Sequence, residues 1–187
     1  MNLLEFLLVL ISVVIGLGLA EILSGVAGLL RARRSVRSYW IHSLFQCGIF
    51  LALVQQWWES WGFRGIAEIS YGAMLVFLSA PVVLFLIAHL LYPQSAEDAD
   101  LRGYYYEQAP ILWGLVFLGT FIGTFLRPLS FGDPILEPSN LSGLPTMIFA
   151  VVLVRSTSPR VHALVAPLML LILVLDTLLA AAAIRAG

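Results

Sequence analysis

Six long apolar segments separated by short polar stretches run through the sequence. A helix needs about 20 apolar residues, each rising 1.5 Å, to cross about 30 Å of hydrocarbon. Five of the segments meet this length, and the pattern predicts an all-α integral membrane protein, a bundle of about six transmembrane helices forming a single polytopic domain over residues 1–187. The predicted spans are residues 3–30, 39–58, 69–92, 110–126, 138–154 and 161–184.

The fifth segment is short. Its uninterrupted apolar stretch covers 14 residues, 141–154, and contains Pro145. Pro138 and Ser139 offer a helix start one turn earlier, because proline is tolerated in the first turn. A short but complete span is therefore the favoured prediction. A re-entrant half-helix is the alternative, and it would place the two chain termini on opposite sides of the membrane.

Composition supports a membrane protein, since 60% of the residues are hydrophobic and only 11% are charged. Soluble domains carry about 25% charged residues. The mean hydropathy is +0.97. All ten basic residues are arginine, which with abundant Leu, Ala, Val and Gly indicates a bacterial gene and hence the inner membrane. The formal charge of −1 gives no indication of nucleic-acid binding. The single cysteine, Cys47, excludes an intrachain disulfide and a multi-cysteine metal site.

Arginine placement predicts the orientation, because short cytoplasmic loops are enriched in basic residues. Seven arginines fall on one predicted side and three on the other. The N-terminus is therefore expected outside. No basic residue precedes the first apolar run, so this helix is expected to remain as an anchor rather than to act as a cleaved signal. The inner group is Arg31, Arg33, Arg34, Arg37, Arg102, Arg155 and Arg160, and the outer group is Arg64, Arg127 and Arg185.

Four polar side chains fall in the predicted inner half of the membrane, where unpaired ionisable groups are energetically expensive. Three chemistries suit them: a proton relay, a divalent metal site with Glu21, His42 and His89 as candidate ligands, or axial haem ligation by the two histidines. A buried, purely structural hydrogen-bonded cluster is the alternative. The four residues are Glu21, His42, Gln46 and His89.

Other polar positions lead to separate expectations. Asp176, near the middle of the last segment, is expected to face the bundle interior, where it serves an ion path or a structural hydrogen bond. Acidic residues at a pore mouth raise the local cation concentration, although interfacial charges are more common. His162 is expected in a solvated loop, and the three tyrosines 104–106 are expected to anchor the inner interface. The outer-side polar residues are Gln55, Gln56, Glu59 and Glu68.

Small residues recur at every fourth position of the first segment, a pattern that lets two helices approach closely in a membrane. Packing within the chain is the favoured interpretation, with a seam between copies as the alternative. The first stripe comprises Ser12, Gly16, Ala20, Ser24 and Gly28, and Gly119 and Gly123 repeat the pattern in the fourth segment.

Several function classes lack their motifs, since the sequence has no Walker loop, no GxSxG elbow and no HExxH pair. The leading hypothesis is a small ion or proton channel or transporter in the lipid bilayer. Alternatives are a non-catalytic subunit or scaffold of a larger complex, a haem- or metal-binding redox module, and an intramembrane enzyme using Glu21, His42 and His89. No cofactor is favoured, enzymatic activity is disfavoured, and a second copy or another membrane protein is the expected partner.

Overall fold

The computed structural model of the protein describes residues 3–60, 69–96, 98–135 and 141–186, with side chains described from residue 6 to residue 179 within those ranges. These residues form helices joined by short connections, with one isolated bridge between extended residues, Arg37 and Asp100. The helices are α1 (Leu3–Arg31), α2 (Trp40–Ser60), α3 (Tyr71–Leu90), α4 (Leu101–Phe121), the π-helix η2 (Ile122–Leu126), α5 (Arg127–Phe131), α6 (Gly143–Arg155) and α7 (Pro159–Ala186).

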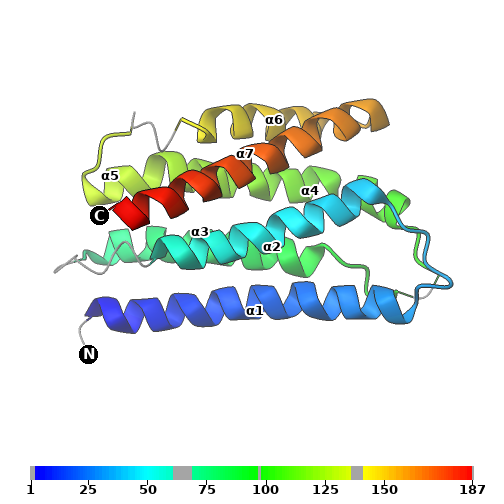
Figure 1. The fold of residues 1–187 in the computed structure, drawn as a ribbon, viewed down its shortest axis with the longest axis horizontal. Coiled ribbons are helices and arrows are strands. Elements are labelled where there is room, and N and C mark those ends of the chain that lie inside the picture. Colours follow the sequence, from blue (N-terminus) through cyan, green and yellow to red (C-terminus); the bar gives the residue numbers. More distant parts are fainter. Residues whose placement is uncertain (1–2, 61–68, 97, 136–140, 187) are drawn as a thin grey trace.

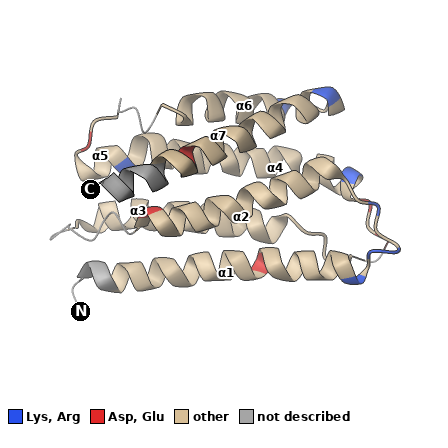
Figure 2. Ribbon diagram, in the orientation of Figure 1, with Lys and Arg blue, Asp and Glu red and all other residues tan. Residues whose placement is uncertain are grey.

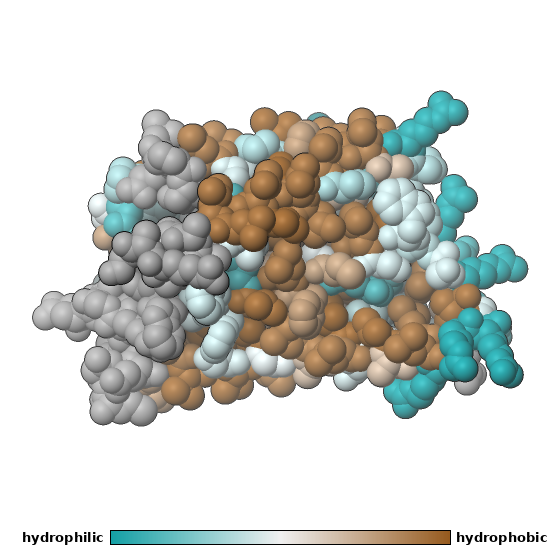
Figure 3. Space-filling view, viewed as in Figure 1, coloured by the Kyte–Doolittle hydropathy of each residue, from teal (hydrophilic) through white to brown (hydrophobic). Residues whose placement is uncertain are grey.

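The helices lie side by side along one axis, and the chain reverses direction at each connection (Figure 1). Apolar side chains cover most of the length of the face in Figure 3, while hydrophilic ones gather at one end. Four segments are long and apolar enough to cross a membrane: Phe6–Arg31, Tyr71–Leu90, Leu101–Phe131 and Pro159–Leu179. The predicted helical membrane bundle is confirmed, and the protein is a multi-pass integral membrane protein.

Five helices form a closed ring: α2, α3, α4, α6 and α7. α2 packs against α3 and α7, α4 packs against α3 and α6, and α6 packs against α7. α1 stands outside this ring and packs on α2 and α3. The ring leaves room for a central cavity, and α1 adds a second layer on one side of it.

The fourth span differs from its predicted bounds. It was expected to begin at Pro110, but α4 begins at Leu101, where the Asp100 side chain caps the helix by accepting from the Arg102 backbone N–H. Pro110 therefore lies inside the helix, where it removes one backbone hydrogen bond without ending the helix. The tyrosine run 104–106 consequently lies on the first two turns of α4.

The fifth span is the short helix that its apolar length indicates. α6 has 13 residues, Gly143–Arg155, and its expected start at Pro138 lies outside the described residues. At 1.5 Å per residue α6 is about 20 Å long. α1 begins and α7 ends at the same end of the bundle (Figure 1), so the segment between α5 and α7 carries the chain from one end to the other. The chain direction is the one that the favoured prediction of a crossing requires, and α6 itself is shorter than the four segments long enough to cross a membrane.

Seven arginines, those of the loops predicted inside, gather at one end of the bundle, whereas Arg127 at the start of α5 lies at the other end (Figure 2). Two connections pair at the end with the seven arginines: the Arg37 N–H donates to the Ala99 carbonyl at 3.0 Å, and the Leu101 N–H donates to the Arg37 carbonyl at 3.2 Å. The α1–α2 and α3–α4 connections are thus tied together at the arginine end.

The small-residue stripe of α1 does not pack within the chain, so the favoured interpretation of that pattern was wrong. Ser12, Gly16, Ala20 and Ser24 are exposed on the outer face of α1, and a Cβ at Gly16 or Gly28 would meet nothing within 4 Å. The glycines that α1 uses for close packing lie on its other face: Gly18 faces Leu53 of α2, and Gly25 faces the Tyr92 ring. In α4, Gly119 does pack within the chain, against Val83 of α3.

We expect Gly25→Leu to lower the free energy of unfolding by about 1–3 kcal/mol, the usual effect of overfilling a packed contact. The added side chain would overlap the Tyr92 ring, which lies directly against Gly25. Gly16→Leu is the matched control, because it makes the same change on the same helix in open space. Reversible unfolding in bicelles, followed by circular dichroism, compares the two; equal stabilities would contradict this packing.

Candidate functional site

A cavity of about 320 Å³ lies inside the five-helix ring, lined by side chains from α2, α3, α4, η2, α6 and α7. On α2 the lining runs from Leu44 to Glu59, and on the α4–α5 segment it runs from Trp113 to Arg127, fourteen residues further along the chain. Fourteen residues of helix rise about 21 Å. The cavity is therefore drawn out along the bundle axis, from the end opposite the arginine loops toward the middle of the protein.

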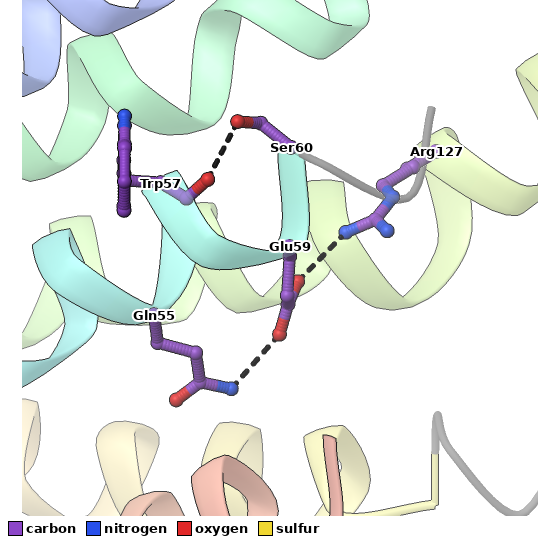
Figure 4. A network of polar contacts seen from close by, with 5 residues as sticks. All are labelled: Gln55, Trp57, Glu59, Ser60 and Arg127. Carbon is purple, nitrogen blue, oxygen red and sulfur yellow. Dashed lines mark hydrogen bonds and ion pairs between the residues drawn. The ribbon is translucent and has the colours of Figure 1, made fainter. Parts of the chain in front are cut away.

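The outer end of the cavity holds a chain of hydrogen-bonded polar side chains (Figure 4). Arg127 Nη1 lies 3.1 Å from Glu59 Oε2, and the Gln55 amide donates to Glu59 Oε1 at 2.9 Å. The Thr177 hydroxyl of α7 lies 2.6 Å from Gln55 Oε1. About 30% of each side chain of the Arg127–Glu59 pair is exposed, at 32% and 28%. The pair thus marks the mouth of the cavity.

Asp176 brings a second carboxylate to the same cavity. Its side chain is hydrogen-bonded to Ser142, the residue just before α6. The charged groups of the described lining are therefore two carboxylates, Asp176 and Glu59, and one guanidinium, Arg127. With all three ionised, the cavity carries one excess negative charge. Asp176 lines this cavity, as its predicted inward orientation requires, and so do Gln55, Gln56 and Glu59 of the predicted outer side, whereas Glu21, His42, Gln46 and His89 do not.

The π-helix η2 shapes this part of the lining. The Arg127 N–H donates to the Ile122 carbonyl five residues earlier, so one turn is wider than in an α-helix. Pro128 follows directly, and its ring would clash with the carbonyl of Thr124 in a regular α-helix. The wide turn accommodates the proline, places Gly123 and Thr124 on the cavity wall, and positions Arg127 beside Glu59. π-turns of this kind often occur at functional sites.

The inner part of the cavity is apolar and ends at aromatic rings. The rings of Phe45 and Trp113 lie 4.5 Å apart between centroids, at a tilt of 39°. Val83 and Ile87 of α3 line the adjacent wall. The cavity therefore has an apolar inner part and a charged mouth.

A hydrogen-bonded histidine lies between this apolar part and the arginine end. The Trp113 indole N–H donates to the Tyr105 hydroxyl at 3.1 Å, and that hydroxyl lies 2.9 Å from His162 Nδ1. His162 Nε2 lies 2.8 Å from the Ser156 carbonyl, which only accepts, so Nε2 carries the proton and Nδ1 accepts from Tyr105. His162 is fully buried, not solvated as its neighbourhood in the sequence suggests.

A second buried histidine is held in the same way. His42 Nε2 lies 2.8 Å from the Leu91 carbonyl, and the Gln46 amide nitrogen lies 3.0 Å from His42 Nδ1. Both ring nitrogens are therefore used, and this hydrogen-bonding pattern requires a neutral ring. The predicted proximity of His42 and Gln46 is confirmed. His42, Tyr105 and His162 are each fully buried near the arginine end of the bundle, and they are called the inner layer below.

Glu21 and His89 also form a pair, but on the outer face of the bundle. His89 Nδ1 lies 3.3 Å from Glu21 Oε1, and the two side chains are 61% and 39% exposed. No hydrogen bond or ion pair in the described part of the chain joins them to His42 and Gln46. The four residues predicted as one inner cluster therefore form two separate pairs, because shared depth on different helices does not make their faces coincide.

Nor do the described residues form a metal site of three or more His, Cys, Asp or Glu side chains. Glu21 and His89 approach each other, whereas both nitrogens of His42 are engaged elsewhere. A metal or haem at His42 would have to displace Leu91 or Gln46.

Comparison of the chain with protein-family models, curated proteins and solved structures gives no match.

We expect Tyr105→Phe to lower the free energy of unfolding by about 2 kcal/mol or more, because it leaves both the Trp113 N–H and His162 Nδ1 buried without their partner. Tyr71→Phe is the control, since Tyr71 is 72% exposed. Unfolding monitored by tryptophan fluorescence measures the difference. A Tyr105→Phe protein as stable as the Tyr71→Phe protein would show that the layer is not held by this hydrogen bond.

Proposed function

We propose that the protein is a small membrane transporter for protons or cations, and that its path begins at the charged mouth of the central cavity. The observation that carries the proposal is that two carboxylates, Glu59 and Asp176, and a single guanidinium, Arg127, line one cavity inside a largely apolar bundle. Ionisable groups at this depth are expensive, and they commonly mark ion or proton pathways.

The arrangement favours a gated path over an open pore. A cation entering at Glu59 and Asp176 meets hydroxyl groups of Thr120, Thr124 and Thr146 on the cavity wall. Beyond Phe45 and Trp113 the layer of His42, Tyr105 and His162 is fully buried and closed. Passage therefore requires this layer to rearrange, as alternating-access transport does. For a proton, the hydrogen-bonded Tyr105 hydroxyl and His162 imidazole offer an exchange step within this layer.

The proposed setting is a bacterial inner membrane with the arginine end in the cytoplasm and both termini outside. Seven of the ten arginines at one end support this orientation under the positive-inside rule. The cavity mouth, at the opposite end, then faces the exterior.

A second candidate function, a non-catalytic subunit of a larger membrane complex, is supported by the outer face of α1. The stripe of Ser12, Gly16, Ala20 and Ser24 is exposed, and Glu21 of the same helix pairs with His89 of α3 on the outer face. Small residues and polar groups on a membrane helix favour contact with another helix. This face would also serve association between copies of this chain. Absence of ion flux would leave this second candidate standing.

Orientation is tested with single cysteines in a Cys47→Ser background. Ser38 and Asp133 are exposed at opposite ends of the bundle. We expect a membrane-impermeant maleimide to label Asp133→Cys in intact cells and Ser38→Cys only after the membrane is opened, because the arginine end stays inside. The reverse pattern would place the cavity mouth in the cytoplasm.

Transport is tested in proteoliposomes by following proton or cation flux with an internal pH dye or ion-selective dye. We expect flux above that of empty vesicles, lowered roughly tenfold or more in Asp176→Asn, since a tenfold change needs only about 1.4 kcal/mol of lost cation stabilisation. Glu21→Gln is the matched control, because that carboxylate lies on the outer face. Flux equal to that of empty vesicles for protons, Na⁺ and K⁺ would count against transport.

A further inference from the structure

We propose that the cavity binds an organic cation that carries an unbranched apolar chain, with the cationic group beside Asp176 and Glu59 and the chain along the apolar wall. This inference rests on the proposed function, because it names the substrate class of the same cavity. The ligand class follows from three features of the lining: its length, its gradient of polarity and its charge.

The length of the cavity argues for a chain. A volume of about 320 Å³ is near the lower limit for small-molecule sites. Drawn out over about 21 Å of helix, such a volume is narrow. A single alkyl chain fits a narrow apolar slot better than a compact ring system of equal volume.

The gradient of polarity gives the orientation of the ligand. The polar groups Gln55, Glu59, Arg127 and Asp176 are confined to the outer end, whereas Phe45, Val83 and Trp113 line the apolar part. An ion uses only the polar end of such a site. An amphiphile uses both ends, because burying its chain against the apolar wall adds favourable free energy for every methylene group.

The charge selects a cation over an anion. Arg127, the one basic group of the described lining, already contacts Glu59 at 3.1 Å, so an anionic head group would have to compete with this carboxylate. The Asp176 carboxylate has no such cationic partner within the described lining and is hydrogen-bonded to the Ser142 hydroxyl. An incoming ammonium would supply the opposite charge that balances the cavity.

Binding is measured on the full chain in lipid nanodiscs by equilibrium dialysis, with binding to empty nanodiscs subtracted. The probes are radiolabelled decyltrimethylammonium and decyl sulfate, which have the same chain length and opposite permanent charges. We expect saturable binding of one decyltrimethylammonium per chain and at least tenfold weaker binding of decyl sulfate. Equal affinity for the two probes, or no saturable binding of the cation, would overturn the proposal.

Charge and space are then tested separately with matched variants. Asp176→Asn is expected to weaken cation binding by about tenfold or more, as loss of a desolvated charge partner does, while Glu21→Gln leaves it unchanged. Gly123→Leu is expected to abolish binding, because Gly123 lines the cavity and has open space at its Cβ position. Gly114→Leu is its control. Gly114 lies on α4, which continues directly into η2, and it also has open space at its Cβ position but does not line the cavity.

Circular dichroism and gel filtration check that each variant is folded, and Asp176→Asn carries the test if Gly123→Leu fails to fold. Wild-type affinity in Asp176→Asn would overturn the assignment of the cationic end. Wild-type affinity in a folded Gly123→Leu protein would overturn the cavity as the site. If decyltrimethylammonium binds saturably but no ion flux is found, the cation site stands and the proposed transport function is rejected. If ions flow but the cation does not bind, the transport function stands and the cation site is rejected.

Discussion

A polar side chain inside this bundle must find its hydrogen-bond partner within the protein, because lipid offers none, and much of the structure follows from that constraint. The buried side-chain nitrogen and oxygen atoms of the described residues all have partners. At the inner end these partners bridge different helices: His42 of α2 reaches the Leu91 carbonyl after α3, and Tyr105 of α4 reaches His162 of α7. Each bond fixes the relative rotation of two helices, which apolar contacts alone specify less sharply. These bonds therefore fix how α2, α3, α4 and α7 pack at the arginine end.

The two ends of the bundle meet the constraint in opposite ways. The inner layer consists of neutral groups, fully buried, in which donors and acceptors match one to one. The outer end uses charges instead, and Glu59 and Arg127 remain partly exposed, so that water still solvates them. Neutral buried groups thus lie toward the arginine end, and the charged groups of the cavity lie toward the other end. The wide turn of η2 contributes to this difference between the two ends, because it accommodates Pro128 and places Arg127 at the mouth of the cavity.

The helix bounds in the structure show which of the bounds could be predicted from hydropathy alone. α1, α2, α3 and α7 begin and end within about two residues of their predicted positions, because each is a continuous apolar run with polar flanks. α4 begins nine residues before its predicted start at Pro110, because the helix continues through the polar residues Glu107 and Gln108 that interrupt the apolar run. Hydropathy does not register a cap such as Asp100, nor the protein contacts that let polar residues continue a membrane helix.

Depth in the membrane was determined by the sequence, because each residue of a helix adds a fixed rise. That is why the arginine end and the inner positions of His42 and Gln46 were predictable. The direction in which a helix face points was decided only by tertiary packing, since one chain's periodicity relates positions on a helix to each other but not to the neighbouring helices. The same depth thus holds Glu21 and His89 on the outer face and His42 in the interior. The small-residue stripe of α1 faced outward for this reason, and the cavity emerged where α2, α4 and α7 turned Glu59, Arg127 and Asp176 toward one another.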